Sequence, residues 1–292
     1  MRIDDGAEWL CLTCKAITLY LPDAPTREQV LKAWEAYKGA CPRDRLKLVK
    51  NVEMLDFEPL ESPAQPDALN PYLASQDERR DEGITVWDEG PECCWSLNVQ
   101  GVVLPEAMPS ASFCRVWFPE DVDDEVVYRL AIALADGIPF LSGDAGYTCM
   151  FDPSKKAYAF NHIYACAKRY LGLDVDDLNA TLPVVLRAIK GANWLTLVGN
   201  DLWERLAEEA GGPPRFDPPV TAEQRQFGWV IRAGEHPVLA DRNRREFPEA
   251  YVAVERALLP IKIQSHPEFA GRFEEEGATM AWLRRLVEPE NW

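Results

Sequence analysis

A repeated order of one strand and one helix constrains the fold of this chain more than any other feature. Residues 9–21, WLCLTCKAITLYL, alternate as a strand whose two faces are both largely apolar, and Pro22–Asp23 ends this strand before a helix. The same order returns in residues 114–137, where Pro119–Glu120 separates a strand from an acidic helix start, an amphipathic helix and a glycine. We interpret this as an internal duplication. The alignment matches Ile17, Leu19 and Leu21 with Cys114, Val116 and Phe118, and Gly39 with Gly137 after a one-residue insertion.

The other segments mix short strands, hairpins and helices without a regular βαβ repeat. This mixture predicts an α+β fold in which helices pack on mixed or antiparallel sheets. Residues 228–241 are expected to form a hairpin and residues 261–264 a strand, whereas residues 213–224 read as a Pro-rich linker. The duplication leaves two arrangements open: one domain over residues 1–292, or two similar lobes of about 1–110 and 111–292.

The run Arg187–Leu206, RAIKGANWLTLVGNDLWERL, is the least generic stretch of the sequence. Asn193 is a suitable N-cap for a helix that would extend to the glycines at 211–212. Gly199 is unusual inside a helix, and a close approach of another backbone would explain it. The apolar positions of this expected helix follow spacings of three and four: Trp194, Leu195, Val198, Leu202 and Leu206.

The charge balance restricts the partners of the chain. Forty-eight acidic residues against 31 basic ones give a net charge of −17, which repels nucleic acid and anionic membranes and suits a basic partner. The sequence has no membrane-spanning run and no visible targeting segment. Eight cysteines without a signal peptide indicate reduced thiols, so we expect a cytoplasmic protein.

Sequence motifs for catalysis or metal binding are weak. Cys11 and Cys14 have CxxC spacing, but they lie in a strand pattern, and the only other close pair, Cys93–Cys94, has the wrong spacing for zinc. None of the three histidines accompanies a nucleophile signature, and no phosphate-binding glycine loop is present. We therefore expect no metal, no cofactor and no enzymatic activity. One alternative is an enzyme with an unrecognised site around His162, Cys166 or Asp144.

Two acidic clusters remain as candidates for a partner surface. The first opens the helix of the second repeat, where carboxylates also complement the helix dipole; the second lies in the connector LDVDDLNATLP. By charge alone we expect both clusters, with Asp144 beside them, to attract a basic partner and speed its association. The candidate residues are Glu120, Asp121, Asp123, Asp124, Asp144, Asp174, Asp176 and Asp177.

Several runs together resemble one protein family. IKGANWLTLVGNDLWERL is similar to the signature run of bacterial type VI secretion immunity proteins that are paired with VRR-NUC nuclease effectors. Further matching runs are ITLYLPD, VLKAWEAY, GDAGYTC, VIRAGEHPVLAD, ALLPIKI and TMAWLRRL, whereas Cys149 and much of residues 59–110 match nothing in the family pattern.

The resemblance implies a cytoplasmic protein that binds a co-encoded DNA-cleaving toxin and has no catalysis of its own. Nucleases of this class use acidic residues and a divalent metal and present a basic surface to DNA. An acidic inhibitor is complementary to such a surface, so the charge and the resemblance agree. A different type VI toxin as the target is the alternative within the same class.

Overall fold

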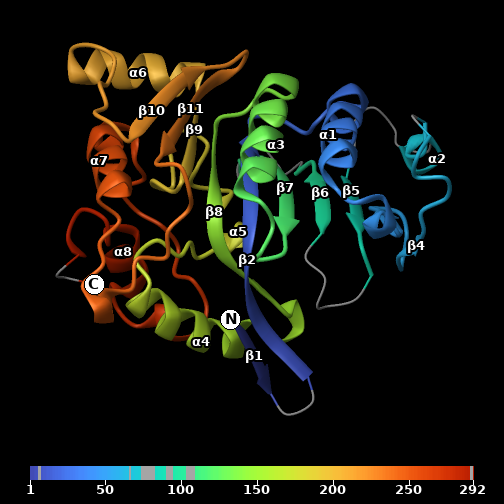
Figure 1. Cartoon of the computed structure of the whole chain (residues 1–292), viewed down its shortest axis with the longest axis horizontal. Coiled ribbons are helices and arrows are strands. Elements are labelled where there is room, and N and C mark those ends of the chain that lie inside the picture. Colours follow the sequence, from blue (N-terminus) through green and yellow to red (C-terminus); the bar gives the residue numbers. More distant parts are fainter. Residues whose placement is uncertain (6–7, 66, 74–82, 90–94, 103–108, 290–291) are drawn as a thin grey trace.

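The computed structural model of the chain describes all residues except 6–7, 66, 74–82, 90–94, 103–108 and 290–291. Its described strands form one 11-stranded sheet, ordered β10-β11-β9-β8-β2-β7-β6-β5-β3-β4, with β1 paired to β2 (Figure 1). Every strand-to-strand ladder is antiparallel. The α+β class with antiparallel pairing is therefore confirmed. The strands are β1 (Arg2–Asp5), β2 (Glu8–Leu21), β3 (Leu48–Asn51), β4 (Glu58–Pro59), β5 (Gly83–Trp87), β6 (Ser96–Gln100), β7 (Ser112–Phe118), β8 (Ser142–Phe151), β9 (Leu195–Gly199), β10 (Val220–Gln224) and β11 (Gly228–Ala233).

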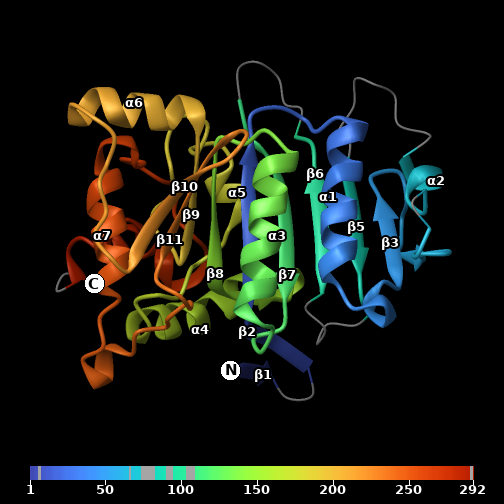
Figure 2. The same cartoon turned by 45° about the horizontal axis from the view of Figure 1, so that its top comes forward.

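The helices surround this sheet. α1 and α3 lie side by side over its central strands, α2 lies beyond one end, and α6 and α7 lie toward the other (Figures 1 and 2). The largest apolar core lies between the sheet and α1, α3, α6 and α7, and a second core surrounds α4 and α8. The helices are α1 (Arg27–Ala40), α2 (Asn70–Leu73), α3 (Asp124–Gly137), α4 (Lys156–Arg169), α5 (Leu178–Thr181), α6 (Asn200–Ala210), α7 (Glu249–Leu258) and α8 (Ala278–Leu283).

The expected strand over residues 9–21 is β2, at the centre of the sheet. Both of its faces are covered, which explains why the residues that point to either face of the strand are largely apolar. Ile17 packs in the core under α1 and α3, whereas Tyr20 belongs to a separate cluster on the other face. Cys11 and Cys14, three residues apart, likewise fall in different clusters.

The duplicated strand–helix units are visible as β2–α1 and β7–α3. Both helices have 14 residues, and each begins six residues after its strand ends. Thr26 forms a capping box with Gln29, and Asp123 caps α3 through the Glu125 amide. The expected one-residue insertion is wrong, because Ala40 rather than Gly39 is the counterpart of Gly137 when the helix ends coincide.

The two repeats are interleaved within one sheet. β2 lies between β7 and β8, so a strand from the first part of the chain is inserted between two strands from the second. The ranges 1–110 and 111–292 therefore contribute to the same sheet, with contacts from α1 to α3 joining the repeats.

The single long helix expected after Asn193 is wrong. Residues Leu195–Gly199 form β9, which pairs with β8 and β11, and α6 begins only at Asn200. The five residues of β9 are all buried, and ladder bonds on both sides outweigh the helical spacing. Gly199 is the N-cap, and a Cβ there would lie 2.4 Å from the Phe140 carbonyl oxygen, so the expected close approach is confirmed. Gly211, at φ 74°, ends α6 as expected.

Three further expectations near the C-terminal end are wrong. The hairpin partner of β11 is β10, within the range read as a linker, and residues 238–241 do not pair with β11. They instead bond to the backbone after α4, where Leu171 and Gly172 donate to Ala240 and Leu239. Residues 261–264 make only an isolated bridge, between Ile189 and Lys262.

Candidate functional site

The two acidic clusters contact opposite faces of the sheet. Lys15 and Thr18 are three residues apart in the regular part of β2, so their side chains point to opposite faces. Lys15 pairs with Asp124 at the start of α3, whereas Thr18 lies opposite Asp144 in the β2–β8 ladder. The first cluster and Asp144 are therefore not neighbours on one surface.

The first cluster, residues 120–125, remains largely on the outside. Glu120, Asp121 and Asp123 are exposed, and Glu120 accepts a hydrogen bond from the N-terminal ammonium at 2.6 Å. Asp124 is half-buried and is held by the Lys15 ammonium at 2.6 Å and by His236 Nδ1 at 2.9 Å. The outward charge of this cluster therefore lies mainly on Glu120, Asp121 and Asp123.

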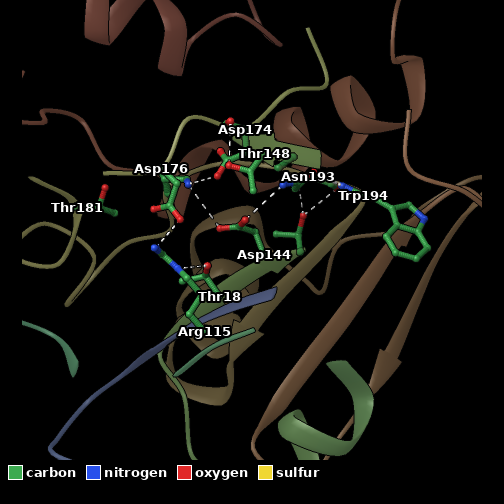
Figure 3. A network of polar contacts seen from close by, with 12 residues as sticks. Thr18, Arg115, Asp144, Thr148, Asp174, Asp176, Thr181, Asn193 and Trp194 are labelled. Carbon is green, nitrogen blue, oxygen red and sulfur yellow. Dashed lines mark hydrogen bonds and ion pairs between the residues drawn. The ribbon is translucent and has the colours of Figure 1, made fainter. Parts of the chain in front are cut away.

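Asp174 of the second cluster and Asp144 of β8 lie beside a buried lysine, and Figure 3 shows these two aspartates close together. Lys190 is only 5% exposed. Its Nζ donates to Asp174 Oδ2 at 2.6 Å and lies 3.7 Å from Asp144 Oδ2. Thr148 donates to the Asp174 carbonyl at 3.2 Å, which fixes the connector against β8. The ammonium therefore acts as an internal counter-ion for two carboxylates from distant parts of the chain.

A second buried cation extends the same network. Arg115 on β7 pairs with Asp176, and its Nε donates to the Thr18 hydroxyl at 3.3 Å. Asp177, the next connector carboxylate, pairs with Lys156 of α4 at 2.7 Å. The connector is thus attached by its carboxylates to the sheet and to α4.

Asn193 joins two of the runs that carry the family resemblance. Its Nδ2 donates to Asp144 Oδ1 at 3.3 Å, and its Oδ1 accepts from the Trp194 amide at 2.8 Å. A Cβ on Gly146 would lie 2.1 Å from that Oδ1, so only glycine leaves room for the Asn193 amide. The Asn193 side chain of GANW can therefore occupy this position only because residue 146 of GDAGYTC is a glycine.

Burial sets the electrostatics of the network. It raises the pKa of Asp144 and raises the pKa of Asp174 to about 7. Burial alone would lower the pKa of Lys190, but Asp144 and Asp174 beside it raise that pKa well above its ordinary value. Burial also raises the pKa of Tyr20, whose hydroxyl has no hydrogen-bond partner within the described chain. The ammonium therefore stays charged while Asp174 is readily protonated.

The structure corrects the expectation that Asp144, Asp174, Asp176 and Asp177 lie on a solvated surface. All four are at most 7% exposed, and each is beside a cation. The connector is drawn inside because its carboxylates alternate with buried Leu173 and Val175. That alternation was the signal in the sequence, but Arg115, Lys190 and Asn193 could be identified as partners only from the fold.

The residues of the alternative catalytic site each interact with different partners in the part of the chain that the structure describes. Asp144 contacts Lys190 and Asn193, whereas His162 packs edge-on against Tyr158. Cys166 lies 3.7 Å from the Met1 sulfur, and burial raises the pKa of its thiol. A raised pKa disfavours the thiolate that a nucleophilic cysteine needs.

Within the described ranges, no group of three or more His, Cys, Asp or Glu side chains is arranged to hold a metal ion. Cys11 and Cys14 are buried in separate clusters, and Cys93 and Cys94 lie outside the described residues. Among the helices that the structure describes, none has the length and apolarity needed to cross a membrane.

Fold and site define an acidic, single-sheet α+β protein whose central carboxylates are already paired with its own cations. A family model described as TsiV, type VI immunity for VRR-NUC, matches residues 103–286. This match covers more than half of the chain, which therefore belongs to this family of type VI immunity proteins.

A solved structure has the same fold. The Pseudomonas aeruginosa T6SS protein PA0821 is similar with a TM-score of 0.81 and 20% sequence identity. The similarity covers 99% of this chain and 90% of that one. A search of curated proteins finds no match.

Proposed function

We propose that this chain binds a VRR-NUC nuclease effector of a type VI secretion system and neutralises it by covering its active site or its DNA-binding groove. The observation that carries the proposal is the match of residues 103–286 to the immunity family for such effectors. A nuclease must bring cations to the DNA backbone, so a chain with a net charge of −17 is complementary to its working surface.

Inhibition in this proposal is by binding, without chemistry of its own. The carboxylates of the buried network face Lys190 and Arg115 inside the protein, where a substrate has no access. The outward charges are those of exposed acids such as Glu120, Asp121 and Asp123. We propose that these attract the basic face of the nuclease and that binding takes place in the cytoplasm, where the DNA to be protected lies.

Co-expression tests the proposal directly. The gene for the adjacent effector is induced in a host cell with and without this chain, and survival and chromosomal DNA integrity are measured. We expect rescue, co-purification of the two proteins, and loss of DNA cleavage by purified effector when this chain is added in equimolar amount. Absence of both rescue and co-purification would refute the proposal. Rescue from an unrelated type VI toxin but not from the nuclease would show that this other toxin is the target.

A further inference from the structure

A groove at the β4 end of the sheet carries charges that nothing described neutralises. It lies between the turn after β3 and the segment before α2, and it encloses about 630 Å³. Four exposed carboxylates line it, from Glu53, Glu58, Glu61 and Asp67. Among the described residues, no cation forms an ion pair with any of the four.

The walls of this groove are fixed by hydrogen bonds. Asn51, itself buried, accepts through Oδ1 from the amides of Glu53 and Met54 at 3.1 Å each. Its Nδ2 donates to the Tyr72 carbonyl at 2.8 Å, and the Tyr72 hydroxyl donates to the Pro59 carbonyl at 3.2 Å. One side chain therefore joins the turn to α2, so the backbone beside Glu53 and Glu58 is fixed before any partner arrives.

Exposed apolar side chains occur in the turn after β3. Leu55 is 92% exposed and Val52 46% exposed, and both belong to the turn whose Glu53 and Met54 line the groove, although neither lines it. Lys50 ties this turn to β3, because its Nζ donates to the Leu55 carbonyl at 2.6 Å. Exposed apolar groups that are rimmed by polar ones mark sites of protein–protein contact.

We propose that this groove docks a basic segment of the effector, with Lys or Arg side chains among the four carboxylates and an apolar side chain on Leu55 and Val52. The inference rests on the proposed function and deepens it by naming the face that binds. Charge decides the occupant: a second copy of this chain would bring a net charge of −17 to an acidic groove, and nucleic acid would be repelled.

The groove also lies outside the part of the chain that the family model matches. That match starts at residue 103, whereas the residues that line the groove lie between Asn51 and Tyr72. A feature outside the matched part can differ between family members, and immunity proteins must distinguish their own effector from others. The groove is therefore suited to selecting the cognate nuclease.

Charge reversal with a matched control tests the groove. The variant Glu53→Lys/Glu58→Lys/Glu61→Lys and the control Glu204→Lys/Glu208→Lys/Glu276→Lys each exchange three exposed glutamates, so they change the net charge equally. Binding of the purified full-length chain to its effector is measured by titration calorimetry, with circular dichroism and thermal melting to confirm folding. We expect the groove variant to bind about tenfold more weakly or worse, and the control to stay within about twofold of the wild type.

A neutral variant separates the effect of the apolar side chains in the turn from the effect of the charges. Leu55→Ala/Val52→Ala should weaken binding about fivefold or more, and unlike the charge variant its loss should persist in high salt. Equal loss in the groove variant and the control would show a non-specific charge effect and overturn the proposal. Wild-type affinity in both groove variants would also overturn the groove proposal. In that case, rescue of the host cell by the wild-type chain would still support the proposed function.

A second copy of this chain or a small cation in the groove would give results that differ from those expected for the effector. If the wild-type chain forms a dimer that the groove variants dissociate, the groove belongs to a second copy, which overturns the proposal. Binding of a small polyamine such as spermidine, with unchanged effector affinity in the variants, would overturn it as well. If the wild type neither binds nor rescues, the proposed function fails and the groove proposal fails with it.

Discussion

Thr18 and Arg115 lie directly opposite each other in the β2–β7 ladder, and they are also equivalent positions of the two strand–helix repeats, 97 residues apart. Positions that are both equivalent and adjacent lie beside an approximate two-fold axis that relates the repeats. The repeats differ at this point: one supplies a hydroxyl, and the other a guanidinium that donates to that hydroxyl and pairs with Asp176.

Replacing Arg115 with methionine should destabilise the protein strongly. The change leaves the Asp176 carboxylate buried without its cation, which costs about 3–5 kcal/mol of unfolding free energy. Urea denaturation followed by circular dichroism measures the loss. The double variant Arg115→Met/Asp176→Leu removes both charges and should recover part of it. A single variant within about 0.5 kcal/mol of the wild type would show that the pair does not hold the connector.

Gly146→Ala should lower stability because its methyl group would meet the Asn193 amide at 2.1 Å. We expect a loss of about 1–3 kcal/mol, as for overpacking elsewhere in protein cores. Gly39→Ala is the matched control, since a Cβ there meets nothing within 4 Å and the site is inside α1. The control should be neutral or stabilising by up to about 1 kcal/mol. Equal thermal melting temperatures for the two variants would contradict the proposed dependence of Asn193 on Gly146.

The buried carboxyl of Asp174 should make stability fall as the pH rises. Its pKa is about 7 in the folded chain, against an ordinary value of 3.8, so the folded state binds the extra proton between those values. Relative to Asp174→Asn, the wild type should lose unfolding free energy from about pH 4 to about pH 7, by at most about 1.4 kcal/mol per pH unit. Denaturant titrations of both proteins across this range measure it. Parallel pH profiles would show that Asp174 is already ionised at pH 4.

The exposed part of the first acidic cluster should act on the rate of association. Glu120→Lys/Asp121→Lys/Asp123→Asn removes the outward charge, and asparagine at 123 keeps the cap on α3. We expect a slower association with the effector, a nearly unchanged dissociation rate, and a smaller difference at high salt. Stopped-flow binding at two ionic strengths measures these rates. An unchanged association rate at low salt would place the attracting surface elsewhere.

Local chemistry was enough to predict much of the secondary structure. Pro22–Asp23 and Pro119–Glu120, with the caps Thr26 and Asp123, set the lengths of both repeats, because these signals act within a few residues. The apolar spacing around Gly199 fits both a helix and a buried strand, and only the neighbours β8 and β11 decide between them. The same holds for β10, whose strand conformation depends on β11.

The sequence by itself determined the α+β class, the family resemblance and the acidic character, since composition and short-range order do not depend on which segments meet. Only the tertiary structure decided which charges face outward. Asp121 and Asp176 are the same type of residue, and each lies in an acidic run of the sequence. Asp121 is nevertheless exposed, whereas Asp176 lies against Arg115 inside the protein. The difference arises because a buried carboxylate is stable only beside a cation, and that cation comes from a strand far away along the chain.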